Sequence, residues 1–117
     1  MSNCYTIITA SDYLVCSRKK SERLDALLHA DKDACHGFKL EYDGDEGWAS
    51  LYAEESGNES ELPEEFLQEL GRLIASMDMQ FLEFGAAQYN DKPKLGSTGG
   101  YQFRIMTDGQ IVYPTVK

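Results

Sequence analysis

The sequence lacks Lys and Arg between Lys39 and Arg72, although this interval holds eleven of the chain's twenty acidic residues. The whole chain carries a formal net charge of −9. An acidic surface repels the phosphate backbone and has no counterions to exchange with it, so direct binding to nucleic acid is disfavoured. The sign of the charge instead favours a basic partner, although solubility alone would also explain it.

Long apolar runs are also missing. No stretch approaches the roughly 18 to 20 apolar residues that a membrane span requires. The first twenty residues show no charged, then apolar, then small pattern of the kind found in secretory leaders. The three cysteines are an odd number, which fits a reducing compartment better than a framework of disulfides. We therefore expect a cytoplasmic protein without a membrane partner.

Histidine is scarce, and this limits both metal binding and catalysis. The two histidines are His29 and His36. Cys35 and His36 are adjacent, whereas zinc ligands come in pairs about two to four residues apart, and no second pair exists. A nucleophile needs a nearby base, and Cys16 or Cys35 with His29 is the conceivable combination. We expect no metal, no cofactor and no catalytic residue, and thus not an enzyme.

Two loop patterns are incomplete matches to ligand-binding motifs. Asp43, Asp45 and Glu54 fit positions 1, 3 and 12 of a calcium loop, but Trp48 stands where that loop needs glycine. The small residues of 94–100 resemble a phosphate cradle, yet they lead into a predicted strand rather than a helix. We expect neither ligand. The loop over residues 90–100 is instead the best candidate for a mobile contact loop.

Strands predominate among the predicted elements. With 117 residues, 42% hydrophobic and 26% charged, the chain is predicted to form one domain over residues 1–117. Alternating or β-branched runs predict strands at Cys4–Ala10, Tyr13–Cys16, Phe38–Tyr42, Trp48–Ala53, Met79–Tyr89, Tyr101–Met106 and Ile111–Tyr113.

Three turns are expected between these strands. Ser11 and Asp12 are a turn signal, which predicts that the first two strands form a hairpin with Cys4 facing Cys16, both as free thiols. The segment 43–47 predicts a second hairpin. Asp108-Gly109 predicts a tight turn with positive φ at both residues.

Two helices complete the prediction. The first is expected to begin with Ser21 as its N-cap, because the bases of 18–20 would oppose the positive end of the helix dipole, and to end at Gly37. Its buried stripe is Leu24, Leu27, Leu28 and Cys35. The second begins near Pro63, with Phe66, Leu70, Leu73 and Met77 as its buried stripe. The order ββαββαβββ predicts an α+β two-layer sandwich, with two helices on one face of a mainly antiparallel sheet.

The acidic interval carries the candidate site. It spans a hairpin, a loop and a helix start, and Tyr42, Trp48 and Tyr52 are interleaved with its acids. Aromatic rings beside carboxylates suit contact with a basic, arginine-rich surface. The predicted partner-binding residues are Asp43, Asp45, Glu46, Trp48, Tyr52, Glu54 and Glu55.

Three hypotheses for function follow. The leading one is a small acidic non-enzymatic inhibitor that docks its acidic face on a basic, nucleic-acid-binding surface of a partner such as a nuclease. Anti-CRISPR, anti-restriction and nuclease-immunity proteins are analogous in size and charge, and no motif adds to that analogy. The second is a structural or assembly subunit whose acidic face only confers solubility. The third is a small thiol- or metal-dependent enzyme.

Overall fold

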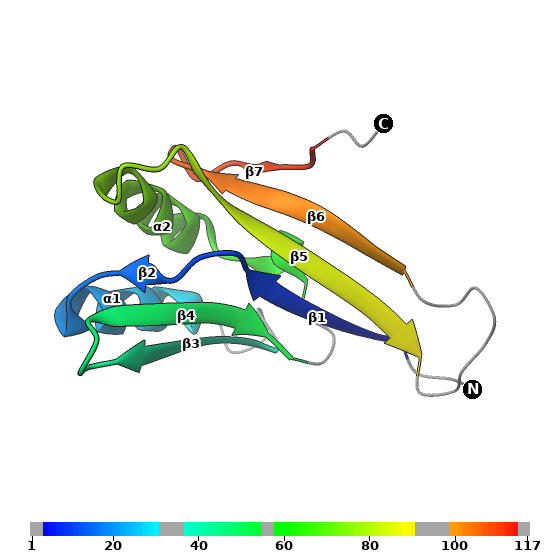
Figure 1. Ribbon diagram of the computed structural model, residues 1–117, viewed down its shortest axis with the longest axis horizontal. Helices are drawn as coiled ribbons and strands as arrows, with labels where there is room; N and C mark the ends of the chain where they lie inside the picture. The colour runs from blue at the N-terminus through cyan, green and yellow to red at the C-terminus, as the bar shows by residue number, and fades with distance from the viewer. Residues whose placement is uncertain (1–3, 31–36, 55–57, 91–98, 115–117) are drawn as a thin grey trace.

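The computed structural model describes residues 4–30, 37–54, 58–90 and 99–114. It contains a seven-stranded antiparallel sheet with both helices on one face, which confirms the α+β prediction (Figure 1). The order is the expected ββαββαβββ, with a short 3-10 helix, η1, added before the second α-helix. The elements are β1 (Cys4–Ala10), β2 (Leu14–Val15), α1 (Arg18–Leu28), β3 (Phe38–Asp43), β4 (Trp48–Ala53), η1 (Glu59–Glu61), α2 (Glu64–Ser76), β5 (Phe81–Asn90), β6 (Gly99–Met106) and β7 (Ile111–Val112).

The predicted hairpin between the first two strands is wrong. β1 pairs with β4 through Ile8 and Ala53, and β2 pairs with the same strand through Leu14 and Ala49, in the same antiparallel sense. Because β3 occupies the other side of β4, β1 and β2 follow one another along a single edge. The Ser11-Asp12 signal therefore marks a bulge and not a chain reversal.

This arrangement also removes the expected proximity of the first two cysteines. Cys4 pairs with Asn90 at one end of β1, whereas Cys16 follows β2 beyond the bulge. A disulfide requires Cα atoms closer than about 7 Å, and two positions at opposite ends of a continuous edge do not approach that distance. Cys16 is a free thiol.

The hydrophobic core lies between the sheet and the two helices. Phe66, Leu70 and Ile74 of α2 are fully buried, and Leu73 is nearly so, while Met77 is half-buried at its end. Across β5 and β6, the rings of Phe84 and Phe103 stack with their centroids 4.9 Å apart. Leu24 and Leu28 complete the core from α1. The predicted Cys35 lies outside the described residues.

The N-cap of helix α1 lies four residues earlier than the predicted cap, Ser21. Ser17 is its N-cap, and its Oγ accepts a hydrogen bond from the amide of Lys20 at 3.2 Å. Arg18 lies over the ring of Tyr42 at 5.3 Å, and Lys20 reaches Glu69 of α2. These tertiary contacts and the cap offset the unfavourable position of the bases at the positive end of the helix dipole. The helix ends at Leu28, before the expected Gly37.

The β6–β7 turn also differs from its prediction. Gly109 has a φ of +87°, but Asp108 is not among the described residues with positive φ. The amide of Gly109 donates to Met106 O, and the amide of Met106 donates to Gln110 O. This is the three-residue loop that combines a type I turn with a bulge at glycine. The glycine packs on α2, where an added Cβ would lie 3.1 Å from the carbonyl of Leu67.

Candidate functional site

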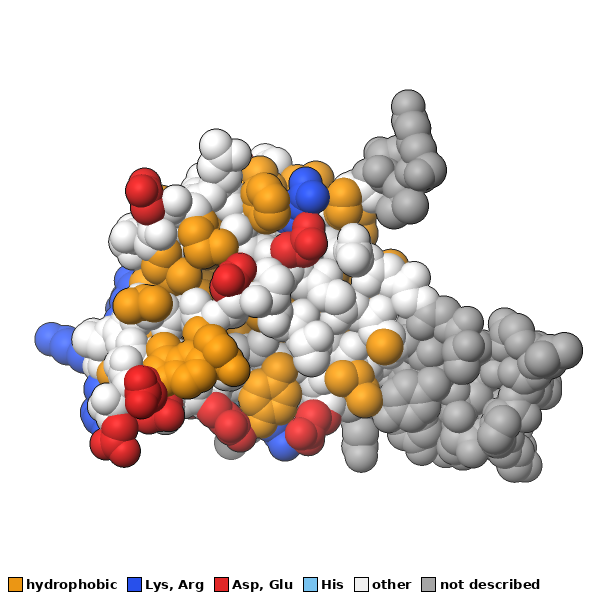
Figure 2. Space-filling model, in the orientation of Figure 1, with side chains coloured by type: hydrophobic (Ala, Val, Ile, Leu, Met, Phe, Trp, Pro, Cys, Tyr) orange, Lys and Arg blue, Asp and Glu red, His pale blue; other side chains and the backbone are white. Residues whose placement is uncertain are grey.

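The sheet face opposite the helices carries the predicted site, and we call it the open face. In β3 and β4 the side chains of Leu40, Ala49 and Leu51 point to the helices, so their neighbours point away. Figure 2 shows this face, with acids gathered around hydrophobic side chains near one end of β3 and β4. The open face comprises Ile7, Thr9, Asp12, Tyr13, Val15, Lys39, Glu41, Asp43, Trp48, Ser50, Tyr52, Phe81, Glu83, Gln102, Arg104 and Val112, and we count with it Asp45 and Glu46, which project from the adjoining β3–β4 turn.

The bulge between β1 and β2 brings two further side chains onto the open face. Residues 10–13 stand opposite only Ser50 and Leu51 of β4, so the bulge holds two extra residues. The amide of Ser11 donates to Glu83 O and keeps the bulge attached to β5. Tyr13 is 54% exposed, and its ring lies edge to face against Trp48. The sequence did not reveal the contact between Tyr13 and Trp48, because it depends on the pairing of both β1 and β2 with β4.

Trp48 is a half-buried residue of this face. Its Nε1 is buried and has no hydrogen-bond partner among the described residues. It lies opposite Asp43 in the β3–β4 register. Asp43 Oδ1 accepts the amides of Asp45 at 3.0 Å and Glu46 at 3.2 Å. Asp43 therefore holds the turn, while Asp45 and Glu46 project from it into solvent.

The remaining predicted residues differ in their surroundings. The hydroxyl of Tyr52 donates to Glu41 Oε1 at 2.6 Å, and this bond to a carboxylate raises the pKa of Tyr52 to about 12. Glu54 pairs with Lys39 at 3.2 Å, so its charge is already balanced. Glu55 lies outside the described residues. Glu41 was not predicted, although its alternation with Leu40 and Tyr42 placed it on the polar side of the strand.

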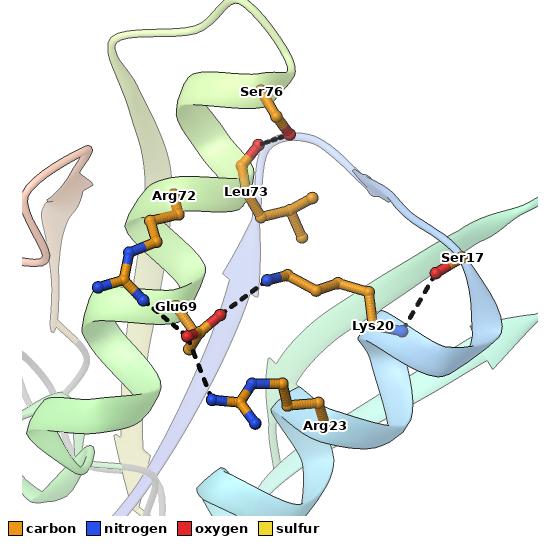
Figure 3. Close-up of polar contacts among 7 residues, drawn as sticks. All are labelled: Ser17, Lys20, Arg23, Glu69, Arg72, Leu73 and Ser76. Atoms are coloured by element: carbon orange, nitrogen blue, oxygen red, sulfur yellow. Dashed lines mark hydrogen bonds and ion pairs between the residues drawn. The ribbon is translucent and has the colours of Figure 1, made fainter.

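The bases gather on the helix layer. Lys20, Arg23 and Arg72 converge on the carboxylate of Glu69, at 2.7, 3.4 and 2.7 Å (Figure 3). The bond from Lys20, with help from Arg23, lowers the pKa of Glu69 to about 2. This carboxylate joins α1 to α2. These three bases are therefore paired with an acid of the helix layer and lie away from the open face.

A second buried carboxylate joins η1 to β6 and to the segment after β7. Glu59 is 4% exposed, and its carboxylate accepts from Tyr101 OH at 2.5 Å and from Tyr113 OH at 3.3 Å. Burial and the neighbouring carboxylate raise the pKa of both tyrosines. More than forty residues separate Glu59 from each tyrosine, and no sequence signal links them. The cluster satisfies a buried acid and stabilises the helix side of the fold.

The alternative of a thiol-dependent site finds little support at Cys16. Burial raises the pKa of its thiol, and a protonated thiol is a poor nucleophile. Cys35 and His36 lie outside the described residues. Among the residues that the structure does describe, no three His, Cys, Asp or Glu side chains gather closely enough to hold a metal ion. The same residues include no helix that is both long and apolar enough to cross a membrane.

Comparison with protein-family models, with curated proteins and with solved structures found no match to this chain.

Proposed function

We propose that this protein is a non-enzymatic binding module that docks its open face on a basic surface of a partner protein. The observation that carries the proposal is the composition of that face. Aromatic rings of Tyr13, Trp48 and Tyr52 lie among carboxylates, and the two open-face bases, Lys39 and Arg104, are each paired with an acid. Aromatic contact area beside unbalanced negative charge suits an arginine-rich partner.

The partner is expected to be a different protein. A symmetric dimer formed through this face would place like-charged patches against each other, which is unfavourable. Addition of a strand at β3 is discouraged too, because charged side chains alternate along that edge strand. These two points favour a binding module over an assembly subunit.

The partner surface that fits best is one that normally holds nucleic acid. Such surfaces concentrate Lys and Arg to neutralise phosphates, and an acidic protein competes for the same charges. A protein acting in this way in the cytoplasm would inhibit a nucleic-acid-binding protein or a nuclease. The net charge of −9 supports this role, and it opposes direct binding to nucleic acid.

The test compares two charge-reversed variants in capture from the native host. Asp45→Lys with Glu46→Lys changes the open-face turn, where neither side chain forms an ion pair within the described chain. Glu22→Lys with Glu65→Lys makes the same change in net charge on the exposed helix layer. The proposal predicts a basic protein that the wild type and the helix variant retain and the turn variant loses. Equal retention by both variants would remove the open face as the docking surface.

A further inference from the structure

A hollow of about 320 Å³ lies in the open face above Ser50. Ser50 is small and stands between Trp48 and Tyr52 on the same side of β4. Its partner across the strand pair is Glu41 of β3, and on the other side the bulge supplies Asp12 and Tyr13. The hollow thus has the small Ser50 side chain at its base, the carboxylates of Glu41 and Asp12 on two sides, and tyrosine rings in its lining.

The two carboxylates of the hollow have no cation within the described residues. Glu41 Oε1 accepts the hydroxyl of Tyr52, and no hydrogen bond occupies Oε2 there. Asp12 Oδ2 accepts the hydroxyl of Ser11 at 3.1 Å. The nearest strand neighbour with a base, Lys39, is paired with Glu54. Acceptor capacity therefore remains on both sides of the cavity.

We infer that this hollow is a socket for one arginine side chain of the basic partner. A guanidinium is planar, stacks on aromatic faces and donates several hydrogen bonds in fixed directions, which suits carboxylates on opposite sides of an aromatic-walled cavity. A lysine ammonium is a compact and strongly hydrated charge that cannot stack in this way. The inference rests on the proposed function, because it names the group of the partner that the open face recognises.

The hydroxyl of Tyr52 fixes the orientation of this socket. By donating to Oε1 of Glu41, it holds the carboxylate in place at the side of the hollow and leaves Oε2 without a hydrogen bond among the described residues. Tyr13 contributes an exposed ring, and its edge-to-face contact with Trp48 limits its rotation. Asp12 and Tyr13 reach the hollow because they lie in the bulge between β1 and β2. Bulges often redirect side chains in this way beside functional sites.

The socket is tested by titrating isotope-labelled protein with N-acetyl-arginine methylamide and following amide chemical shifts. The lysine counterpart carries the positive charge but lacks the planar guanidinium. The citrulline counterpart keeps the planar shape but is uncharged. We expect shifts centred on Ser50, Tyr52 and Tyr13, a dissociation constant about fivefold or more lower for arginine than for lysine, and no binding of citrulline. Equal affinity for arginine and lysine, or shifts centred on the turn at Asp45 and Glu46, would overturn the inference.

Variants locate the binding group. Glu41→Gln and, separately, Asp12→Asn are each expected to raise the arginine dissociation constant about fivefold or more. Glu46→Gln removes the same charge from the same face outside the hollow and should change it by less than about twofold. The amide spectrum of each variant shows whether it is folded, and two independent variants protect the test against misfolding of one. Unchanged arginine binding in both folded variants would contradict the socket.

Failure of the socket is distinguishable from failure of the proposed function. If partner capture is lost with Asp45→Lys and Glu46→Lys but the titration shows no preference for arginine, the open face binds and the socket inference falls. If the variant with Asp45→Lys and Glu46→Lys still captures the partner, the proposed function falls as well. Arginine preference together with loss of capture in Glu41→Gln supports both.

Discussion

Gly71 of α2 lies directly against the carbonyl of Thr107 in the β6–β7 turn, so close that an added Cβ would overlap it. Helix propensity alone predicts that Gly71→Ala stabilises the protein by about 1 kcal/mol. The contact predicts the opposite sign: a loss of about 1 to 3 kcal/mol in the free energy of unfolding, because the turn must move away from the helix. Urea unfolding measures this difference.

Gly85 provides the control for that substitution. A Cβ at Gly85 would meet nothing within 4 Å. Gly85→Ala on β5 is therefore expected to be neutral or stabilising by up to about 1 kcal/mol, since alanine reduces the freedom of the unfolded chain. If Gly71→Ala stabilises as much as Gly85→Ala does, α2 does not pack on the turn as described.

Leu70 tests the position of α2 on the sheet. Its side chain is fully buried, so Leu70→Ala is expected to reduce the free energy of unfolding by about 2 to 5 kcal/mol. Leu67 lies one turn earlier and is only half-buried, so Leu67→Ala should reduce the free energy of unfolding by less. Equal losses at the two positions, measured by urea unfolding, would show that the buried side of α2 is misplaced.

Glu69 predicts an acid-sensitive component of stability. Its folded pKa of about 2 lies below its ordinary value of 4.5, because Lys20 and Arg23 stabilise the carboxylate. A lowered folded pKa means that this contribution is complete above about pH 4.5 and is lost as the pH falls toward about 2. Glu69→Gln should be less stable than wild type at neutral pH and should lose less stability on acidification through that window.

The measurement is thermal unfolding at a series of pH values between about 6 and 2.5. Glu22→Gln is the control, because Glu22 is an exposed acid on α1. It should keep the wild-type dependence on pH. If Glu69→Gln also keeps that dependence, the contacts from the three bases do not stabilise the folded state.

Tyr52 reports the geometry of the open face without any partner. Its phenol pKa of about 12 arises chiefly from the bond to Glu41, with a smaller effect of Glu54. Glu41→Gln should lower the pKa of Tyr52 toward its ordinary value of 10, and Glu54→Gln should lower it much less. Titration of the tyrosine ring signals by NMR checks both. A Tyr52 pKa that is the same in wild type and Glu41→Gln would mean that the pair is not formed.

Local patterns predicted much of this fold because local physical chemistry decides it. The stripe of Phe66, Leu70 and Leu73 and the acids after Pro63 define α2 within a few turns of chain. Alternation around Leu40 and Leu51, with a glycine-containing turn between, defines the β3–β4 hairpin. No distant residue was needed for either element.

The errors occurred where distant residues decide the outcome. The signal at Ser11 and Asp12 fits a turn or a bulge equally well, and only the pairing of both flanking strands with β4 selects the bulge. The bases at the start of α1 are unfavourable for the helix alone, but Glu69 lies forty-nine residues from Lys20 in sequence and stabilises them. Sequence could place Asp45, Glu46 and Trp48 on one hairpin. It could not place Asp12 and Tyr13 beside them, since that proximity depends on the bulge.

The most direct test of the open face as a docking surface is the association rate with the captured basic partner at increasing salt. Wild type should associate fast at low salt and more slowly as the Debye length falls from about 10 Å at 0.1 M to about 3 Å at 1 M. The double change of Asp45 and Glu46 to Lys should associate at least about tenfold more slowly at low salt, with a weaker salt dependence, while Glu22→Lys with Glu65→Lys stays closer to wild type. If the turn variant associates at the wild-type rate, the acids of the open face serve solubility alone and the proposed function is wrong.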